Sequence, residues 1–383
     1  MTMERATQIE LIRELLDLHD RRSPFLDEHW EKPDPERYQS GEFFARERDG
    51  IFLALPQIAS HASELPGPGA FLTLEMSGRP LLLTRDEEGV ARAFYNVCRH
   101  RGAQLVADVS GCRQRFSCPY HAWTWSNAGK LIGVPHEKAG FPDLDREEHG
   151  LHALPCEEYA GWIWVSFAAR DSIDVQSHLG DLAPDIVAMD AETHVVFDTT
   201  SRDIEANWKL LVEGGIESYH FRVAHKDTIA GLFLDNLSSY RCFGPHMRSV
   251  LPRSSLSELR DKPEESWNIG EHANVLYSLF PGSQFLVQED HFVWIQGIPM
   301  GPNRTRMRLS TMIPREANTP ERQGYWRRNH RLTTTTLEED FDLGEGIQRG
   351  LGSGANAHLN FGRFEGALVQ FNRIVDEAID GNA

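Results

Sequence analysis

The spacing of apolar residues changes along the chain and divides it into regions. Near the N-terminus, apolar residues recur at helical spacing between positions 9 and 18, which predicts a helix with one buried face. From about residue 46 to residue 167, short apolar or alternating runs are separated by Gly and Pro, as in the segments 71–76, 79–84 and 161–167. Such runs are typical of short strands, so this region is predicted to be a small all-β domain.

The C-terminal half combines strands with long helices. A strand is expected over 194–200, followed by a helix that begins near Asp203 or Glu205 and runs to about His220. Further strands are expected at 284–287, 291–295 and 305–313, and the remaining chain is expected to be mainly helical, with a break at 350–354. Sheet strands followed by long helices indicate an α+β fold.

Composition and charge exclude several classes of protein. The 383 residues are 40% hydrophobic and 25% charged, which is ordinary for a globular enzyme. A formal net charge of −18 disfavours nucleic acid and anionic membrane surfaces as partners. There is no apolar run of 18 residues, and the first 20 residues lack the apolar core of a signal peptide, so a cytoplasmic protein without a membrane span is expected.

Two short motifs combine thiols with imidazoles. They are separated by 17 residues and contain Cys98, His100, Cys118 and His121. Two Cys and two His are the ligand set of a Rieske [2Fe-2S] centre, although a structural zinc site uses the same residue types. Because each motif pairs one Cys with one His, and because Gly102 and Pro119 favour tight ligand loops, the cluster is the preferred interpretation.

The other three cysteines are isolated in the sequence. They are Cys112, Cys156 and Cys242, and we expect them to be packing residues. Five cysteines are too few, and their number is odd, for a disulfide framework. After the two cluster cysteines are assigned, the remaining three also cannot supply a second cluster with four Cys ligands.

A second pair of histidines, His220 and His225, follows about 100 residues later. A mononuclear non-haem iron(II) oxygenase uses two His and one carboxylate on one face of the metal. Histidines five residues apart do not superpose on a regular helix, so a helix that ends near Phe221, or a local π-type widening, is expected here. The alternative is a pair of histidines unrelated to any metal.

Taken together, these motifs resemble those of the α subunit of Rieske non-haem iron oxygenases, the ring-hydroxylating oxygenase family. The resemblance also rests on Asn207-Trp208-Lys209 ahead of Glu217-Ser218-Tyr219-His220, and it extends from about residue 40 to the C-terminus. It implies that residues 1–44 form an N-terminal helix and connecting segment packing on the catalytic domain. Residues 45–168 would form the Rieske domain, and residues 169–383 a catalytic domain with an antiparallel sheet packed against helices.

The resemblance also implies a role for individual residues. Cys98, His100, Cys118 and His121 would bind the [2Fe-2S] cluster. His220 and His225 would bind a mononuclear Fe(II) together with Asp340, which matches the family's C-terminal acidic motif, and Glu338 and Glu339 are the alternative carboxylates. Glu217 would be the inter-subunit electron bridge between a cluster histidine of one subunit and an iron histidine of its neighbour, in a homotrimer.

The chain departs from the family's usual residues at three positions. Glu217 stands where most relatives have Asp, as in the branch that acts on quaternary amines. That branch tends to have Cys where this chain has Ser218, which weakens the assignment to it. Gly214 replaces an Asn that is often found near the iron, so no role of that Asn is carried over.

The activity implied by the resemblance is that of a terminal oxygenase component. It would use O2 to hydroxylate an aromatic or other small apolar substrate, as in aromatic hydrocarbon catabolism, and it would be a mono- or dioxygenase. No glycine-rich dinucleotide fingerprint is present, so electrons from NAD(P)H would arrive only through a separate reductase, with or without a ferredoxin. Alternatives are a monooxygenase or demethylase of a quaternary or methylated amine, a Rieske electron-transfer protein without oxygenase activity, and a zinc-stabilised binding module.

The substrate pocket is expected between about residues 212 and 310. The apolar and aromatic candidates for its lining are Phe221, Leu232, Phe233, Leu234, Phe280, Phe285 and Trp294. An apolar lining would suit an aromatic ring, whereas a methylated amine would need an aromatic cage with a nearby acid.

Overall fold

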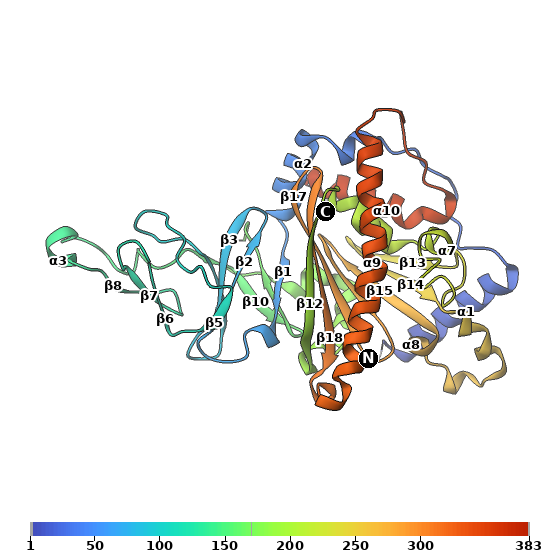
Figure 1. Cartoon of the computed structure of the whole chain (residues 1–383), viewed down its shortest axis with the longest axis horizontal. Helices are drawn as coiled ribbons and strands as arrows, with labels where there is room; N and C mark the ends of the chain where they lie inside the picture. Colours follow the sequence, from blue (N-terminus) through green and yellow to red (C-terminus); the bar gives the residue numbers. More distant parts are fainter. Residues whose placement is uncertain (1–2, 170, 382–383) are drawn as a thin grey trace. The chain divides into compact units, whose positions relative to one another are not determined.

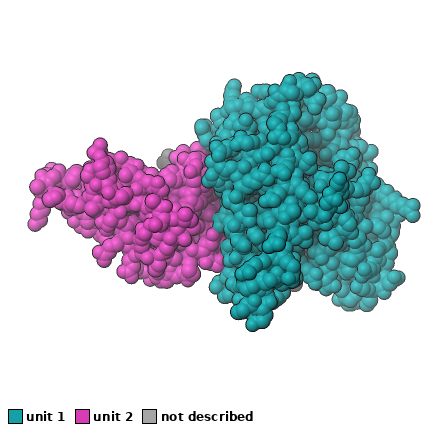
Figure 2. Space-filling model, viewed as in Figure 1, with its two compact units in different colours: residues 1–52, 179–383 teal, residues 53–178 magenta. Residues whose placement is uncertain are grey.

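A computed structural model describes residues 3–169 and 171–381, which form two compact units. Residues Leu53–His178 make up the smaller unit, and residues Met1–Phe52 together with Leu179–Ala383 make up the larger one (Figure 2). Within the described residues, none of the helices combines the length and the apolar character needed to cross a membrane.

The smaller unit is built from short antiparallel strands. A five-stranded sheet has the order β5-β2-β3-β4-β9, and two three-stranded sheets have the orders β1-β11-β10 and β6-β7-β8. The turn between β2 and β3 contains Ser77 and Gly78, both with positive φ, as a tight two-residue hairpin requires. The elements are β1 Gln57–His61, η3 Ala62–Glu64, β2 Ala70–Met76, β3 Arg79–Arg85, β4 Ala91–Tyr95, β5 Ser110–Cys112, β6 Arg115–Ser117, β7 Thr124–Ser126, β8 Leu131–Gly133, α3 Glu137–Gly140, β9 Ala153–Leu154, β10 Cys156–Tyr159 and β11 Trp162–Val165.

The larger unit contains a seven-stranded antiparallel sheet with the order β12-β18-β17-β16-β15-β14-β13. Its long helix α9 (Gln323–Leu351) runs along this sheet (Figure 1). Leu211 of α6 (Trp208–Ile216) and Phe341 of α9 join a buried apolar cluster with Ile295 and Leu309 of the sheet. The strands are β12 His194–Ile204, β13 Ser239–Phe243, β14 His246–Pro252, β15 Ala273–Leu279, β16 Ser283–Val287, β17 Phe292–Gly301 and β18 Arg304–Pro314.

Shorter helices and turns complete the larger unit. The N-terminal helix α1 (Arg5–Arg21) buries Leu11, Ile12 and Leu15 and packs against α8 (Ile269–His272). The others are η1 Pro35–Tyr38, α2 Gly41–Glu47, η2 Arg48–Phe52, η4 Gly180–Leu182, α5 Ala183–Ala188, η5 Ala191–Thr193, α7 Phe221–Ala224, η6 Ser254–Asp261, η7 Glu264–Ser266, η8 Arg315–Ala317, η9 Pro320–Arg322, η10 Arg363–Glu365 and α10 Gly366–Ile379, while α4 Val175–Leu179 lies where the two units join in the chain.

These elements confirm the α+β class and most of the predicted strands and helices. The helix expected after the first strand of the C-terminal half is different. Its cap is Asn207, whose side chain accepts the Lys209 N–H, and not Asp203 or Glu205. Asp203 instead extends strand β12 and pairs with Arg304 and Arg306, so strand pairing outweighs its capping preference. The helix also ends at Ile216 and does not continue to His220.

Candidate functional site

Three side chains in the larger unit converge on one point. The Nε2 atoms of His220 and His225 are 3.2 Å apart, and Oδ1 of Asp340 is 3.5 Å from the first and 3.1 Å from the second. Adjacent ligands of a six-coordinate ion with bonds of about 2.1 Å lie about 3.0 Å apart. The three atoms therefore have the spacing of ligands on one face of a metal ion. Among the described residues, His220, His225 and Asp340 are the group of His, Cys, Asp or Glu side chains that comes close enough together to hold one.

The break in the helix after Ile216 explains how the two histidines meet. Glu217 has an extended backbone, with φ −127° and ψ 169°, and the chain then enters the short helix α7. His220 is the residue before α7 and His225 the residue after it, so the histidines flank one helical turn. This corrects the expectation of a helix ending near Phe221 or widened there, because α7 begins at Phe221.

Each histidine is oriented through its second ring nitrogen. Nδ1 of His220 hydrogen-bonds to Glu217, which also accepts the backbone N–H of Tyr219. Nδ1 of His225 lies 2.8 Å from Oε2 of Glu339, and Thr228 donates to the same oxygen at 2.7 Å. A carboxylate at Nδ1 keeps a proton there and leaves Nε2 free as a metal ligand.

From the sequence, Glu339 was predicted only as an alternative metal ligand. In the structure its carboxylate contacts Nδ1 of His225, while Asp340 contacts both Nε2 atoms. Neighbouring side chains on a helix point about 100° apart, so adjacent acids can contact opposite sides of one ring. Glu338 is exposed and belongs to neither group.

The charge balance of this group favours a cation. Burial lowers the pKa of His225, but the hydrogen bonds and charges of Asp340 and Glu339 outweigh burial, so the pKa of His225 is raised overall. The donor set of two imidazoles and one carboxylate suits a divalent iron ion with open positions for other ligands.

Replacing Glu339 by Gln is expected to weaken iron binding by about 10–100-fold, because it removes the charge that orients and polarises His225. The measurement is an anaerobic Fe(II) titration of protein stripped by mild chelation. Glu338→Gln is the matched control, since it removes an exposed acid from the preceding position. Equal iron affinity in the two variants would contradict this role for Glu339.

A cavity of about 430 Å³ opens beside these ligands, with His225 and Asp340 in its lining. One wall is the sheet, where alternate residues point the same way and contribute Leu276, Leu286 and Ile295. The facing wall is α9, where the lining residues recur at one helix face: Leu332, Thr333, Thr336, Leu337 and Asp340. Two of the three candidate metal ligands, His225 and Asp340, therefore border a cavity that is mainly apolar.

The predicted pocket residues fall into three groups. Phe221, Leu232 and Phe233 line the cavity. Phe280 borders a smaller separate cavity. Leu234, Phe285 and Trp294 are not part of the lining, and the last two are fully buried.

Gly214 and Gly215 also line the cavity. A Cβ atom at Gly214 would meet nothing within 4 Å, whereas one at Gly215 would approach Oε1 of Gln284 to 3.1 Å. The absence of a side chain at Gly214 therefore leaves space in the cavity, and the absence of one at Gly215 permits close packing on β16.

In the smaller unit, two loops with the same backbone pattern present the predicted cluster residues. Gly102 N–H bonds to the carbonyl of Cys98 at 2.9 Å, and Ala122 N–H bonds to that of Cys118 at 3.0 Å. Both Gly102 and Ala122 have positive φ, which turns the chain back after the His-containing segment. The sequence indicated this turn at Gly102, but Ala122 carries no such signal.

The four predicted ligands lie together. Cys98 and Cys118 are buried neighbours, and burial raises the pKa of the Cys98 thiol, while the backbone N–H groups of His100 and Arg101 act on it in the opposite direction. The His100 and His121 rings have centroids 4.6 Å apart. The backbone N–H groups near Cys98 stabilise its sulfur as an anion, which is the form that binds iron.

His100 fits a metal ligand in a further respect. Its Nδ1 is buried and has no hydrogen-bond partner, although its ring stacks on Trp123 at a centroid distance of 5.0 Å. Burial, with the nearby charges of His121 and Arg101, lowers the pKa of His100 and so favours the neutral imidazole. A buried ring nitrogen without a partner is costly unless something binds it, and an iron ion would do so.

The packing role predicted for the remaining cysteines is confirmed for Cys156, which packs against a buried apolar cluster, and is wrong for Cys112 and Cys242. Cys112 and Cys242 are exposed, and Cys156 is half-buried. All five cysteines are free thiols in the structure.

A buried acid lies behind the cavity. Glu213 accepts a hydrogen bond from Tyr38 and one from Asn372, both at 2.7 Å. Burial raises the pKa of Glu213 from 4.5 to about 7, although these hydrogen bonds and the charge of Lys209 act in the opposite direction. Glu213 precedes the two cavity glycines, so it fixes the end of α6 next to the cavity.

The raised pKa of Glu213 predicts a pH-dependent stability. The folded protein holds this proton more tightly than the unfolded chain, so the contribution is present below about pH 4.5 and is lost as the pH rises to about 7, amounting to about 3 kcal/mol. Glu213→Gln is expected to reduce the fall in unfolding free energy between these pH values, as measured by denaturant unfolding. Glu377→Gln, at an exposed glutamate of α10, is the control, and an unchanged pH slope in Glu213→Gln would contradict the prediction.

Comparisons with protein families match both units. A model described as the Rieske [2Fe-2S] domain matches residues 56–155, and one described as the ring hydroxylating alpha subunit (catalytic domain) matches residues 191–381. Both predicted groups of ligands lie in the corresponding matched segments. The match to the catalytic domain also accounts for the second half of the chain, which an isolated electron carrier or a zinc module would not explain.

Curated relatives and solved structures agree with these matches. The oxygenase subunit of carnitine monooxygenase from Acinetobacter pittii is 27% identical over 82% of this chain and 84% of its own length. The α subunit of biphenyl 2,3-dioxygenase from Rhodococcus jostii is 30% identical over 49% of this chain and 42% of its own length.

A solved structure also shares the fold. The quaternary ammonium Rieske monooxygenase CntA with L-carnitine has a TM-score of 0.77 at 23% identity, covering 93% of this chain and 97% of that chain. At this identity the structural likeness shows the fold alone. Together with the family matches, it means that the chain belongs to the Rieske non-haem iron oxygenases, as a terminal component with a Rieske [2Fe-2S] domain and the catalytic domain of a mononuclear iron mono- or dioxygenase.

Proposed function

We propose that this oxygenase hydroxylates an aromatic or other small apolar substrate in the cavity beside His220, His225 and Asp340, which would hold the mononuclear Fe(II). Cys98, His100, Cys118 and His121 would hold the cluster. The observation that carries the proposal is that His225 and Asp340, two of the three side chains whose ligand atoms converge, line a mainly apolar cavity of about 430 Å³. A cavity of this volume suits a small organic molecule.

The chemistry divides between the bound groups and the chain. When bound, the cluster would supply stored electrons and the iron would supply a site for the activation of O2. Insertion of one oxygen atom uses one O2, two electrons and two protons and releases one water, whereas addition of both atoms uses the same electrons and protons without releasing water. The apolar side chains of the cavity orient the substrate and exclude water, and Glu217 and Glu339 keep protons on the Nδ1 atoms of the two histidines.

Rieske oxygenases take their electrons from a separate electron-transfer partner, and for this chain we propose a reductase, with or without a ferredoxin. Glu217 would be the bridge to a cluster histidine of a neighbouring subunit in a homotrimer. Its contact with Nδ1 of His220 supports the half of this bridge that lies within one chain. Mass measurement of the purified protein tests the trimer.

A cytoplasmic location is part of the proposal. The five free cysteines support it, because thiols persist in reducing compartments. Activity or protein recovered only from an oxidising compartment would contradict it.

Oxidation of a methylated amine is the second candidate. The carnitine monooxygenase relative favours it, as do Phe221 and Phe233, which line the cavity with ring centroids 5.6 Å apart. An ammonium group is bound best by Trp and Tyr with a nearby acid. Among the described lining residues there is no Trp or Tyr, and Asp340 is the acid, so the geometry favours the first candidate.

The test is a single turnover with labelled oxygen. Iron-loaded protein, reduced anaerobically, is mixed with ¹⁸O2 and with indole, naphthalene, benzoate or L-carnitine, and the products are analysed by mass spectrometry. One labelled oxygen in an aromatic product indicates monooxygenation and two indicate dioxygenation. Labelled product from L-carnitine alone would replace the first candidate by the second, and no labelled product from any aromatic compound would contradict the proposed function.

A further inference from the structure

We propose that Arg253 binds a carboxylate group of the substrate, so that the cavity selects an apolar molecule carrying one carboxylate. This inference rests on the proposed function for the identity of the cavity as the substrate site. Arg253 lines the same cavity as His225 and Asp340. Among the described lining residues, Arg253 is the one Arg or Lys, so its guanidinium supplies the positive charge of the lining.

The backbone of Arg253 is held on the wall formed by strands β14 and β15. Arg253 directly follows β14, its N–H donates to the carbonyl of His272 at 2.8 Å, and it forms a bridge with Phe233. This pairing continues the register of the two strands, in which Leu251 lies opposite Asn274. The position of Arg253 is therefore set by the sheet and not by a free loop.

The guanidinium is also held in place. Its Nε and Nη2 both donate to Oδ1 of Asn274, at 3.2 and 2.8 Å, and Asn274 itself is buried. These bonds fix the plane of the fork without neutralising its charge, because an amide oxygen is uncharged. Nη1 makes neither of these bonds and can donate to another acceptor. A guanidinium held in this way loses little conformational freedom when it binds one.

The charge of Arg253 has little compensation in the cavity. The carboxylate of Glu289 lies 3.9 Å from Nη1, but its side chain is 63% exposed and does not line the cavity. The acid that does line it is Asp340, which contacts both metal-site histidines. The side chain of Arg253 is only 24% exposed, and a partly buried cation whose ion-pair partner is a largely exposed carboxylate 3.9 Å away favours an anion beside it.

Polar lining residues gather near Arg253. Ser254 and Ser255 follow it in sequence, and Asn274 lies next to it, whereas the proposed metal ligands come from the two ends of α7 and from α9. The rest of the lining is mainly apolar. A molecule whose carboxylate lies at Arg253 and whose apolar body fills the cavity therefore matches both parts of the lining.

The test compares acids with their neutral amides. Benzoate and 3-phenylpropanoate are paired with benzamide and 3-phenylpropanamide, and L-carnitine is included as an acid that also carries a quaternary ammonium. Binding is measured by calorimetry on iron-loaded protein under nitrogen, so the readout does not depend on turnover. At least one acid is expected to bind about tenfold or more tightly than its amide, as a charge-assisted hydrogen bond implies.

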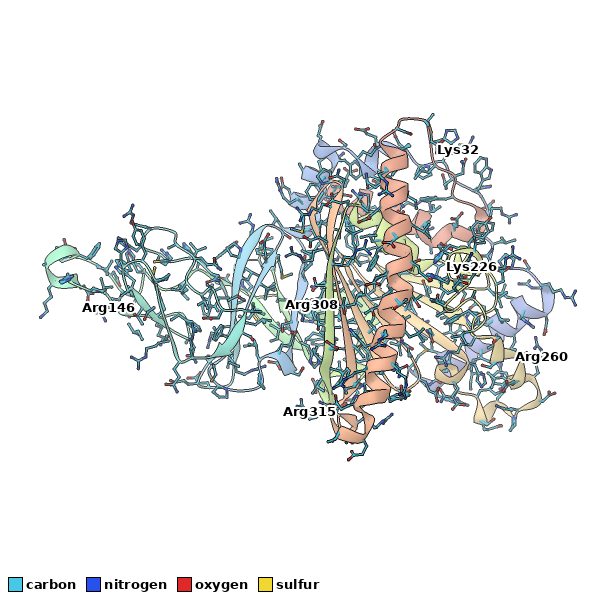
Figure 3. All side chains as sticks on the ribbon, in the orientation of Figure 1. Lys32, Arg146, Lys226, Arg260, Arg308 and Arg315 are labelled. Carbon is cyan, nitrogen blue, oxygen red and sulfur yellow. The ribbon has the colours of Figure 1, made fainter. Side chains whose placement is uncertain are left out.

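Three variants assign this preference to Arg253. Arg253→Met, which keeps a similar length without charge, is expected to reduce the ratio to about one, and Arg253→Lys is expected to restore part of it. Arg260→Met is the matched control, because Arg260 lies beside α1, where it donates to His19 at 2.8 Å, and is not in the cavity lining (Figure 3). If Arg253→Met fails to fold, Asn274→Ala, which releases the fork, is expected to weaken acid binding in the same direction.

The outcomes separate this inference from the proposed function. Equal binding of every acid and its amide, or a preference that survives in Arg253→Met, overturns the role of Arg253 even if ¹⁸O appears in an aromatic product. Arg253-dependent binding of an acid without labelled product supports the carboxylate site and counts against the proposed function. Arg253-dependent binding of L-carnitine alone supports the site and assigns the carboxylate to an amine-bearing acid.

Discussion

Replacing Asp340 by Ala is expected to remove the mononuclear iron and leave the Rieske cluster intact. Asp340 is the carboxylate within 3.5 Å of both Nε2 atoms, and two histidines alone hold iron weakly. Iron per chain should fall from about three to about two while acid-labile sulfide stays at about two. Substrate-dependent O2 uptake should fall more than about 100-fold, because losing a direct ligand exceeds the effect of losing a ligand's partner.

The matched control is Asp342→Ala. Asp342 lies two residues further along α9, where its exposed carboxylate pairs with Arg202. This variant should keep all three irons and normal turnover. Retention of the third iron in Asp340→Ala would mean that another carboxylate completes the site.

In protein loaded with excess Fe(II), replacing Glu217 by Gln is expected to slow electron delivery while both metal sites remain filled. The change keeps the size of the side chain but removes the charge beside Nδ1 of His220. Iron and sulfide content should be unchanged or fall only slightly, and the cluster should still be reducible by dithionite. When reduced protein is mixed with substrate and O2, oxidation of the cluster should slow by about 100-fold.

Two variants decide how this result is read. Glu217→Asp keeps the carboxylate and should retain much of the rate, so a loss that follows charge, and not side-chain length, supports the bridge. Glu365→Gln is the neighbouring control, because Glu365 is an acid near Glu217 whose carboxylate accepts the N–H of Gly362. Normal cluster oxidation in Glu217→Gln would contradict the proposed electron bridge.

Sequence patterns were most informative where one short segment carries the chemistry. Each of the two cluster motifs lies within one tight loop, so residue type and spacing are enough to bring Cys98 next to His100. The strands could also be predicted from the sequence, because the alternate apolar residues of a strand must face a core whatever the rest of the fold is. The free nitrogen of His100 adds a structural observation that agrees with the cluster motif.

The local conformation around the candidate iron ligands was predicted less well. The helix from Asn207 was expected to reach His220, yet it stops at Ile216 and α7 starts at Phe221. Helical periodicity does not report where a chain breaks to serve contacts with distant residues. Here the break lets Glu217 reach His220 while His225 reaches Glu339, which is more than 100 residues away in sequence.

By itself, the sequence determined the order of the two domains, their α+β character, the four candidate cluster ligands and the two candidate iron histidines, because these depend on periodicity and on residues close together in the chain. Asp340, far from the histidines in sequence, came from the resemblance to the family's C-terminal acidic motif. Only the tertiary structure decided which acid contacts which nitrogen of His225, which of the proposed aromatic residues line the cavity, and that Arg253 lines it with Glu289, which is outside the lining, as its ion-pair partner. The physical reason is that these properties belong to surfaces assembled from the sheet, α7 and α9. The distances between these elements are set by packing, so the residues that meet there do not recur at regular intervals in the sequence.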